Sequence, residues 1–222
     1  MACDLDRAGA VHLPKLILGA IEEWDQIWLA SKIEARAGKR LYDLPAMSSA
    51  IDALISNPEL GDLLGAGEWR CVRALALNKH PRSNWALGWH QDRVIAVREQ
   101  GECEGFENWT EKSGILHVCP PVELHAAMRT LRLHLDPVGP KTGQLLVIPG
   151  SHDKGRFAEA EIAMIARTSA AAACPAERGD GWLYATPILH SSKRATLPSQ
   201  RRVIQLDFAP CDLPEPLEWL RI

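Results

Sequence analysis

Residues 131–136 read Leu-Arg-Leu-His-Leu-Asp, and this stretch decides the class of fold. A leucine stands at every second position, and a period of two is typical of a β-strand that buries one face. The same alternation returns at residues 201–208, which read Arg-Arg-Val-Ile-Gln-Leu-Asp-Phe. The short apolar run at 144–149, between two glycines, indicates a further buried strand. The second part of the chain is therefore expected to be β-structure.

The first third of the chain has the period of helices instead. Apolar residues recur at spacings of three and four from Leu16 to Trp28, which indicates an amphipathic helix. Asn57 and Pro58 supply an N-cap and a first-turn proline for a short helix that Gly65 ends. Helices followed by strands favour a β-sandwich or barrel buttressed by N-terminal helices over a doubly wound parallel sheet. We predict one domain over residues 1–222, with mostly helical support at 1–70 and a β-core at 71–210.

Composition and charge narrow the class of partner. The chain has 222 residues, with 25 Lys and Arg against 28 Asp and Glu, a formal net charge of -3. That balance argues against nucleic acid or an anionic membrane as the main partner, because both usually require a basic face. No apolar run approaches the roughly 20 residues of a membrane span, and the acidic N-terminus does not resemble a secretory signal. The six scattered cysteines form no CxxC pair, which indicates reduced thiols. We expect a cytoplasmic monomer or homodimer that acts on a small molecule.

The sharpest local motif is Trp-His-Gln-Asp at residues 89–92. On an extended strand His90 and Asp92 project from the same face, so an imidazole and a carboxylate can chelate one metal ion. His190, which follows the apolar stretch 183–189, is the candidate third ligand. Two histidines and one carboxylate, with the opposite side of the ion open, are typical of non-heme Fe(II) oxygenases. On the motif alone, a surface histidine beside a turn aspartate remains the alternative.

Arg201 stands eleven residues after His190 and opens a predicted strand. A 2-oxoglutarate molecule that chelates iron leaves its distal carboxylate several ångströms away, where a planar guanidinium can hold it by two parallel hydrogen bonds. Arg201 and Arg202 are adjacent and so face opposite ways. Only one of them can point inward, and the other is expected to be an exposed basic residue at the strand end.

Three segments together, in their order and spacing, resemble the phytanoyl-CoA dioxygenase family: residues 77–92, 143–152 (Gly-Gln-Leu-Leu-Val-Ile-Pro-Gly-Ser-His) and 179–208. The resemblance extends from the Asp6–Gly9 region almost to Pro210. It implies a double-stranded β-helix, or jelly roll, and an Fe(II)- and 2-oxoglutarate-dependent oxygenase that uses O2. By this resemblance the iron ligands are His90, Asp92 and His190, and the residues around the distal carboxylate of 2-oxoglutarate are Arg201, Ser192 and Lys79.

Three differences from related enzymes limit which of their activities can be expected of this chain. No basic cluster suited to the pyrophosphate of CoA is visible, so an acyl-CoA substrate is not implied. Related halogenases replace the carboxylate ligand with a small residue, whereas Asp92 is present here. Nucleic-acid demethylases with the same ligands usually carry a second arginine six residues after the first, and that position is Asp207. Hydroxylation of a small molecule is the expected reaction.

Several residues are candidates for contact with the substrate. Arg132 and His134 share the polar face of their strand, which looks either into the site or into water. A buried arginine beside iron would select an anionic substrate, because an unpaired buried charge is costly. Residues 99–121 form a long, irregular, turn-rich insert that we expect to be a lid or substrate loop. Trp109 and His117 are its candidate contacts, and Tyr184 is expected on the inward face with His190.

The prediction is therefore a mainly β jelly-roll enzyme that hydroxylates an aliphatic carbon of an amino acid or a natural-product intermediate. It would use Fe(II) and O2 and convert 2-oxoglutarate to succinate and CO2. The alternative is a catalytically silent jelly-roll protein that binds or senses a ligand.

Overall fold

The computed structural model describes residues 2–42, 44–112, 114–197, 200–220 and 222. Its helices are α1 (Ala2–Ala8), η1 (Leu18–Ala20), α2 (Ile21–Ala30), α3 (Pro45–Ile55), α4 (Pro58–Leu64), η2 (Pro81–Ser83), α5 (Val122–Ala127), η3 (His152–Lys154) and α6 (Glu159–Thr168). Its strands are β1 (Ala10–Leu13), β2 (Gly38–Leu41), β3 (Arg70–Lys79), β4 (Leu87–His90), β5 (Ile95–Val97), β6 (Glu107–Lys112), β7 (Ile115–Cys119), β8 (Arg129–His134), β9 (Leu145–Val147), β10 (Ala172–Cys174), β11 (Gly181–Ala185), β12 (His190–Ser192) and β13 (Arg201–Ala209).

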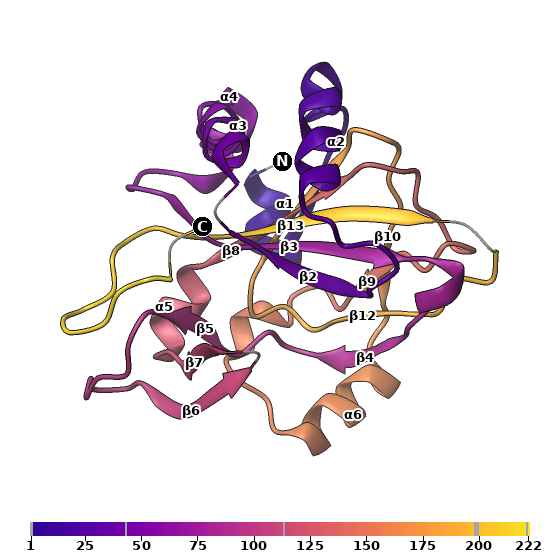
Figure 1. Ribbon diagram of the computed structural model, residues 1–222. Helices are drawn as coiled ribbons and strands as arrows, with labels where there is room; N and C mark the ends of the chain where they lie inside the picture. Colours follow the sequence, from indigo (N-terminus) through magenta and orange to yellow (C-terminus); the bar gives the residue numbers. More distant parts are fainter. Residues whose placement is uncertain (1, 43, 113, 198–199, 221) are drawn as a thin grey trace.

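Two antiparallel sheets form the core of the fold (Figure 1). The large sheet has six strands in the order β1-β11-β8-β13-β3-β2, and the small sheet has four in the order β10-β9-β12-β4. Leu145, Val147 and Cys174 of the small sheet pack against Tyr184 of the large one, so these faces are turned toward each other. This arrangement is the double-stranded β-helix that the sequence predicts, and that prediction is confirmed.

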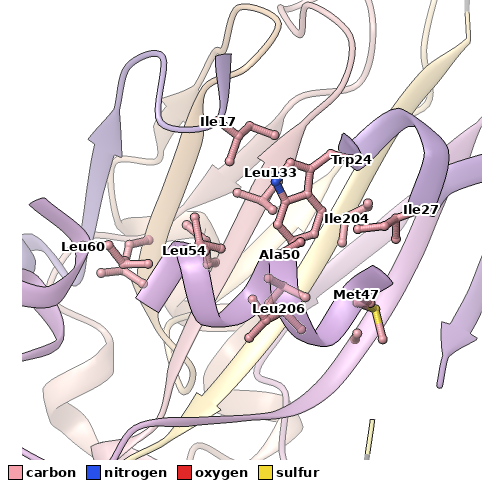
Figure 2. Close-up of a cluster of buried hydrophobic side chains, with 14 of the residues drawn as sticks. Ile17, Trp24, Ile27, Met47, Ala50, Leu54, Leu60, Leu133, Ile204 and Leu206 are labelled. Atoms are coloured by element: carbon pink, nitrogen blue, oxygen red, sulfur yellow. The ribbon is translucent and has the colours of Figure 1, made fainter. Parts of the chain in front are cut away.

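The outer face of the large sheet is covered by α2, α3 and α4 (Figure 1). Trp24 and Ile27 of α2 pack with the outward-facing residues of β8 and β13, among them Leu133 and Ile204 (Figure 2). The apolar stripe predicted from Leu16 onward is buried as expected, although the α-helix itself begins only at Ile21. Because the leucine face of the sheet is used for this packing, the opposite face of the same strands must point between the two sheets.

That inner face of the large sheet is unusually polar. Paired residues of neighbouring strands share a face, and the register places Lys79 opposite Arg201, and Asp207 opposite both Arg73 and Thr130. On β3, β8 and β13 the polar residues of this face are Arg73, Lys79, Thr130, Arg132, His134, Arg201, Gln205 and Asp207. The question left open for Arg132 and His134 is thereby answered, since both look between the sheets and are buried.

The division at residue 70 needs a correction. Residues 1–70 contain helices, as expected, but β1 and β2 also lie there and form the two edges of the large sheet. Each of these strands has four residues, Ala-Val-His-Leu and Gly-Lys-Arg-Leu. A strand this short shows too few alternations to be distinguished from a loop by its hydrophobic pattern.

The insert at 99–121 is not irregular, so that expectation is wrong. Within it β6 and β7 pair antiparallel, and β5 completes a three-stranded sheet in the order β5-β7-β6. Five of the six residues of β6 are exposed, and it reads Glu-Asn-Trp-Thr-Glu-Lys, so no apolar alternation marks it. Val118 of β7 packs in a second core cluster with Val72 and Trp219. A role as a lid or substrate loop stays a prediction.

The apolar stretch that precedes His190 does not form one continuous strand. The chain runs through β11 of the large sheet, then a turn closed by a hydrogen bond from the backbone N–H of Ile188 to the carbonyl oxygen of Ala185 (3.0 Å), and then β12 of the small sheet. His190 therefore begins a strand. Pro187 lies in this turn, where its missing N–H costs no ladder bond. Among the described residues, no helix is long and apolar enough to cross a membrane.

Candidate metal centre

Three side chains, two from adjacent strands and one from the loop that follows β4, converge at one end of the small sheet. His90 is the last residue of β4, His190 is the first residue of β12, and the antiparallel register places them directly opposite each other. Their rings are 4.2 Å apart between centroids. Asp92 lies two residues beyond the end of β4, with its Oδ1 3.9 Å from the Nε2 of His90. One ligand atom of each of the three residues lies within 4.8 Å of the others, which fits a shared metal ion.

Hydrogen bonds set which nitrogen of each imidazole faces the centre of the cluster. The Nδ1 of His90 lies 2.8 Å from the carbonyl oxygen of Gly88, and the Nδ1 of His190 lies 3.0 Å from that of Ile188. A carbonyl oxygen only accepts, so each Nδ1 carries the hydrogen and each Nε2 keeps its lone pair. Burial lowers the pKa of His190 to about 4, which keeps this ring neutral. Both rings are thus arranged as metal-binding histidines usually are.

Asp92 is held in its charged form by its neighbours. Burial by itself would raise the pKa of Asp92, but the charge of Arg73, the strongest of the opposing effects, holds that pKa well below its usual range. The Nη2 of Arg73 donates to the Oδ2 of Asp92 at 3.0 Å, and the Nε of Arg73 donates to Asp207. The cluster therefore offers two imidazole nitrogens and one carboxylate to an ion.

The inner face of the large sheet also carries two buried cations, Arg201 and Lys79, whose hydrogen-bond acceptors are all neutral. We call these two side chains the deep cations. Arg201 is 2% exposed, and its Nη1 donates to the carbonyl oxygen of Gly143 at 2.6 Å. The Nζ of Lys79 donates to the Oγ of Ser192 at 3.1 Å and to the carbonyl oxygen of Lys193. In the described part of the chain neither cation has an ion-pair partner, and the Nε of Arg201 has no hydrogen-bond partner.

The environment of these cations disfavours their charge. Burial, together with the charge of Arg132, lowers the pKa of Arg201 to about 9. Burial, together with the charges of Arg201 and Arg132, lowers the pKa of Lys79 to about 7. Buried cations without a carboxylate are costly. Such a cluster is therefore suited to an anionic ligand.

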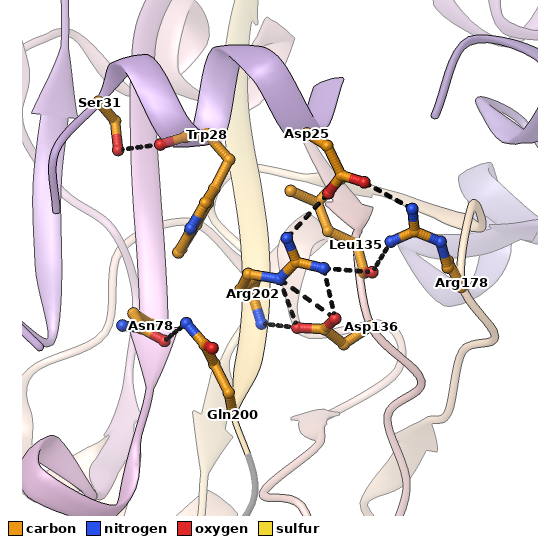
Figure 3. Close-up of polar contacts among 9 residues, drawn as sticks. All are labelled: Asp25, Trp28, Ser31, Asn78, Leu135, Asp136, Arg178, Gln200 and Arg202. Carbon is orange, nitrogen blue, oxygen red and sulfur yellow. Dashed lines mark hydrogen bonds and ion pairs between the residues drawn. The ribbon is translucent and has the colours of Figure 1, made fainter. Parts of the chain in front are cut away.

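Arg202 faces the other way, as the alternation requires. It donates to both carboxylate oxygens of Asp136, at 2.7 and 2.9 Å, and its Nη1 donates to Asp25 of α2 at 2.8 Å (Figure 3). Arg178 donates to the same Asp25. Arg202 is therefore paired on the helix side of the sheet, and Arg201 is the arginine that points inward.

Arg132 lies in the middle of the inner face, between the triad and the deep cations. Its Nε donates to the Oε1 of Gln205 at 3.1 Å, and its guanidinium carbon lies 5.8 Å from the ring centroid of Tyr184. The ring of Tyr184 in turn lies 5.8 Å from that of His190. Arg132 is 5% exposed, and its terminal nitrogens have no partner among the described residues. The structure therefore brings Arg132 and Tyr184 to the candidate site.

The comparisons with known proteins agree with this geometry. The family model of phytanoyl-CoA dioxygenase (PhyH) matches residues 30–203. The chain belongs to the phytanoyl-CoA dioxygenase family. Enzymes of this family are 2-oxoglutarate-dependent non-heme iron oxygenases, and by family the chain is one of them. None of the curated proteins matches the chain.

Solved structures share the fold of this family member at low sequence identity. The 2-oxoglutarate-dependent carbocyclase SnoK from nogalamycin biosynthesis is 16% identical, with a TM-score of 0.68 over 95% of this chain and 83% of SnoK. EctD from S. alaskensis with bound Fe is 18% identical, with a TM-score of 0.66 over 97% and 78%. HygX from Streptomyces hygroscopicus with nickel and 2-oxoglutarate bound is 17% identical, with a TM-score of 0.62 over 95% and 86%.

Other predicted substrate residues have different surroundings. His134 of this family member is buried on the inner face, and neither ring nitrogen has a partner among the described residues. Burial lowers the pKa of His134 to about 3, with help from the charges of Arg201 and Arg132. His117 is buried on β7 and bonds through Nδ1 to the carbonyl oxygen of Ile115 at 2.9 Å. Trp109 lines a hollow formed with residues 100–106 that includes no residue of the triad.

Arg73, Asp207 and Gln205 are site residues that reasoning from the sequence alone did not identify. All three lie on inward positions, Gln205 and Asp207 on β13 and Arg73 on β3. On β13 the alternation with Ile204 and Leu206 indicated which face these side chains share, whereas the inward positions of β3 also hold leucines and so did not single out Arg73. What the alternation did not contain was their pairing, because β3 and β13 are far apart in the sequence.

Proposed function

We propose that this protein is an Fe(II)- and 2-oxoglutarate-dependent hydroxylase of a small anionic molecule, with iron held by His90, Asp92 and His190. The observation that carries the proposal is the convergence of two imidazoles and one carboxylate, with ligand atoms within 4.8 Å of one another. The hydrogen bonds that leave both Nε2 atoms free for a metal support the same assignment.

The deep cations fit the distal carboxylate of 2-oxoglutarate. The unpartnered Nε of Arg201 is a buried donor without an acceptor, and a carboxylate beside it would complete a charge-assisted pair. Lys79 would add a second positive charge, and Ser192 would add a hydroxyl. HygX, which shares the fold, has been solved with nickel and 2-oxoglutarate bound, and this supports the proposal.

Iron, 2-oxoglutarate and O2 would together supply the oxidising chemistry, in which 2-oxoglutarate gives succinate and CO2 and a carbon of the substrate gains a hydroxyl group. The protein's own side chains would hold the reactants. Arg201 and Lys79 would neutralise the distal carboxylate, while buried apolar side chains such as Val147 and Ile188 would exclude water from the interior. The side chains of His90 and Asp92 are 29% and 23% exposed, which leaves the triad an approach from solvent.

The balance of charge supports an anionic substrate. The triad and the inner faces of β3, β8 and β13 contain four cations, Arg73, Lys79, Arg132 and Arg201, and two anions, Asp92 and Asp207. Ferrous iron would add two positive charges and 2-oxoglutarate two negative ones, so two positive charges would remain. One would still remain if Lys79 were neutral. Arg132, whose terminal nitrogens are free, is the cation best placed to bind a carboxylate of the substrate.

The test of the proposed function is formation of succinate from 2-oxoglutarate. Activity should require Fe(II) and should fall at least about 100-fold in Asp92→Ala, because loss of the carboxylate removes one of three ligands. Asp153→Ala, which changes an exposed aspartate outside the site, is the matched control and should keep wild-type activity. Metal-loaded, folded protein that forms no succinate with any substrate would instead support the ligand-binding alternative.

The substrate charge can be tested with matched pairs of amino acids and their carboxamides. The acids should stimulate succinate formation in the wild type, and Arg132→Gln should lose most of that stimulation. 2-Oxoglutarate consumption without added substrate should change little in this variant, since Arg132 is assigned to the substrate. Equal stimulation by acids and amides would refute the proposed preference for an anionic substrate, but it would not contradict the proposed oxygenase activity.

A further inference from the structure

Arg73 lies between two carboxylates at the edge of the candidate metal centre. Its Nη2 donates to the Oδ2 of Asp92 at 3.0 Å, and its Nε donates to Asp207. The side chain of Arg73 is 15% exposed, and that of Asp207 only 4%. These are partly buried, charge-assisted bonds, and charge-assisted bonds are the stronger kind of hydrogen bond in proteins.

The position of Arg73 is set by the large sheet. Asp207 of β13 stands directly opposite Arg73 of β3 in the antiparallel register. The Oδ1 of Asp207 is also 3.3 Å from the Nε2 of Gln205, which donates to it. Because a guanidinium is a planar and rigid group, bonds to two carboxylates determine both its place and its orientation. Arg73 is therefore a fixed donor beside Asp92.

Asp92 needs such a donor more than the two histidines do. It lies beyond the end of β4 and takes part in no ladder pair, so its backbone is less constrained than that of His90 or His190. With Oδ2 occupied by Arg73, only Oδ1 remains on the side of the histidines, 3.9 Å from the Nε2 of His90. A carboxylate held this way presents one oxygen to an ion and leaves more of the ion's coordination positions open.

We infer that Arg73, anchored by Asp207, is a positioning residue that makes Asp92 a one-oxygen ligand. The inference rests on the proposed role of Asp92 as a metal ligand. It assigns a function to Asp207, the position where the related demethylases carry an arginine. Arg73 acts on the metal only through Asp92.

Removing Arg73 should change the metal affinity in opposite directions, depending on whether Arg73 orients Asp92 or acts only through its charge. A positive charge beside a metal site repels the ion, so removing Arg73 should strengthen metal binding if charge alone matters. Removing the group that orients a ligand should weaken it, typically by 10- to 100-fold for such outer contacts. The two explanations therefore predict opposite changes in the same measurement.

The experiment is a titration of the metal-free full-length protein with Co(II), which reports affinity together with the ligand-field absorption of the bound ion. Arg73→Gln should weaken Co(II) binding at least about 10-fold and change the absorption, because Asp92 can then turn both oxygens to the ion. Asp207→Asn should weaken binding less, since Arg73 loses one of its two anchors but remains in place.

Arg40→Gln is the matched control. Arg40 lies on β2, on the same side of the sheet as Leu75 of β3, and makes no hydrogen bond or ion pair with Asp92 or Asp207. Its removal takes a positive charge from the neighbourhood without taking a donor from Asp92. Co(II) affinity in this variant should equal or slightly exceed that of the wild type, with an unchanged absorption spectrum.

The other possible results of the Co(II) titration either support or overturn the positioning role of Arg73. Wild-type protein that binds no Co(II) would overturn the proposed metal site, and this inference with it. If the wild type binds, equal or tighter binding by folded Arg73→Gln would overturn the positioning role alone. If Arg73→Gln does not fold, the same titration is made with Arg73→Lys. An ammonium keeps the positive charge but lacks the planar guanidinium that bonds to both carboxylates. Weaker binding with an altered spectrum in Arg73→Lys supports the inference, and wild-type behaviour refutes it.

Discussion

Lys79 and Arg201 are buried side chains whose hydrogen-bond acceptors are all neutral. The acceptors are the hydroxyl of Ser192 and the carbonyl oxygens of Lys193 and Gly143. Gly143 has a φ of +72°, and a Cβ there would lie 2.7 Å from the Nζ of Lys79 and 2.6 Å from the carbonyl oxygen of Lys193. Only glycine therefore allows this close approach. At the scale of single residues, Lys79 and Arg201 therefore form a cationic group that is suited to binding a carboxylate.

The pKa of Lys79 leads to a pH dependence of 2-oxoglutarate binding. Burial and the charges of Arg201 and Arg132 lower this pKa to about 7 in the free protein, and a bound carboxylate would raise it again. Below about pH 7 Lys79 is already charged, whereas above it binding must take up a proton. The dissociation constant of 2-oxoglutarate for the Ni(II)-loaded protein should therefore rise with pH above about 7, by up to about tenfold per unit.

Variants of lysine residues check the source of that dependence. Lys79→Met should bind 2-oxoglutarate more weakly at pH 6 and show a flat profile from pH 7 to pH 9. Lys154→Met, which changes an exposed lysine of η3, should keep the wild-type slope. A slope that persists in Lys79→Met would show that another group takes up the proton.

At the scale of elements, β13 joins two different environments. Its outward side chains pack against the N-terminal helices or pair with their charges, as Arg202 does with Asp25 of α2 (Figure 3). Its inward side chains line the candidate site. The outward face of β13 thus contributes to the stability of the fold, and its inward face contributes to the proposed binding site. Substitutions of neighbouring residues should therefore change either the unfolding free energy or the ligand affinity, but not both.

Arg201→Gln and Arg202→Gln should show this separation. The Arg201 variant should raise the dissociation constant of 2-oxoglutarate at least about tenfold, because a neutral amide cannot form the charge-assisted pair. Its unfolding free energy without ligand should not fall, because a buried charge without an ion-pair partner is removed. The Arg202 variant should lose about 1.5–3 kcal/mol of unfolding free energy with unchanged 2-oxoglutarate affinity. Urea unfolding and ligand titration measure both quantities, and exchanged phenotypes would contradict the assignment.

At the scale of the whole molecule, the jelly roll encloses more positive than negative charge in its interior. Such a concentration opposes folding of the ligand-free protein, and metal and 2-oxoglutarate would relieve it. Binding of the two ligands should therefore raise the free energy of unfolding of the whole molecule.

Thermal unfolding with Ni(II) and 2-oxoglutarate measures this stabilisation. At a free 2-oxoglutarate concentration 100 times its dissociation constant, binding adds about 2.7 kcal/mol. For a chain of this length that corresponds to a rise in Tm of roughly 5–10 °C. His190→Ala should show little of this rise, because it removes a proposed ligand of the metal that 2-oxoglutarate would chelate. A rise equal to that of the wild type in His190→Ala would place the binding site elsewhere.

Much of the architecture could be predicted from the sequence. Alternation is a property of neighbouring residues, and it indicated the strands at 131–135 and 201–208, the shared face of Arg132 and His134 and the opposite directions of Arg201 and Arg202. The resemblance of three segments to a known family indicated the jelly roll. Short or polar strands such as β2 and β6 were not predicted, because their sequences carry no apolar period.

By itself, the sequence determined which side chains share a face of each longer strand, because that depends only on the local geometry of the backbone. The tertiary structure decided which faces meet. Arg73 and Asp207 are 134 residues apart, and they bond only because β3 and β13 are neighbours in one register. His90 and His190 converge for the same reason on β4 and β12. Register depends on how the whole chain packs, so the anchored donor beside Asp92 becomes visible only in the folded molecule.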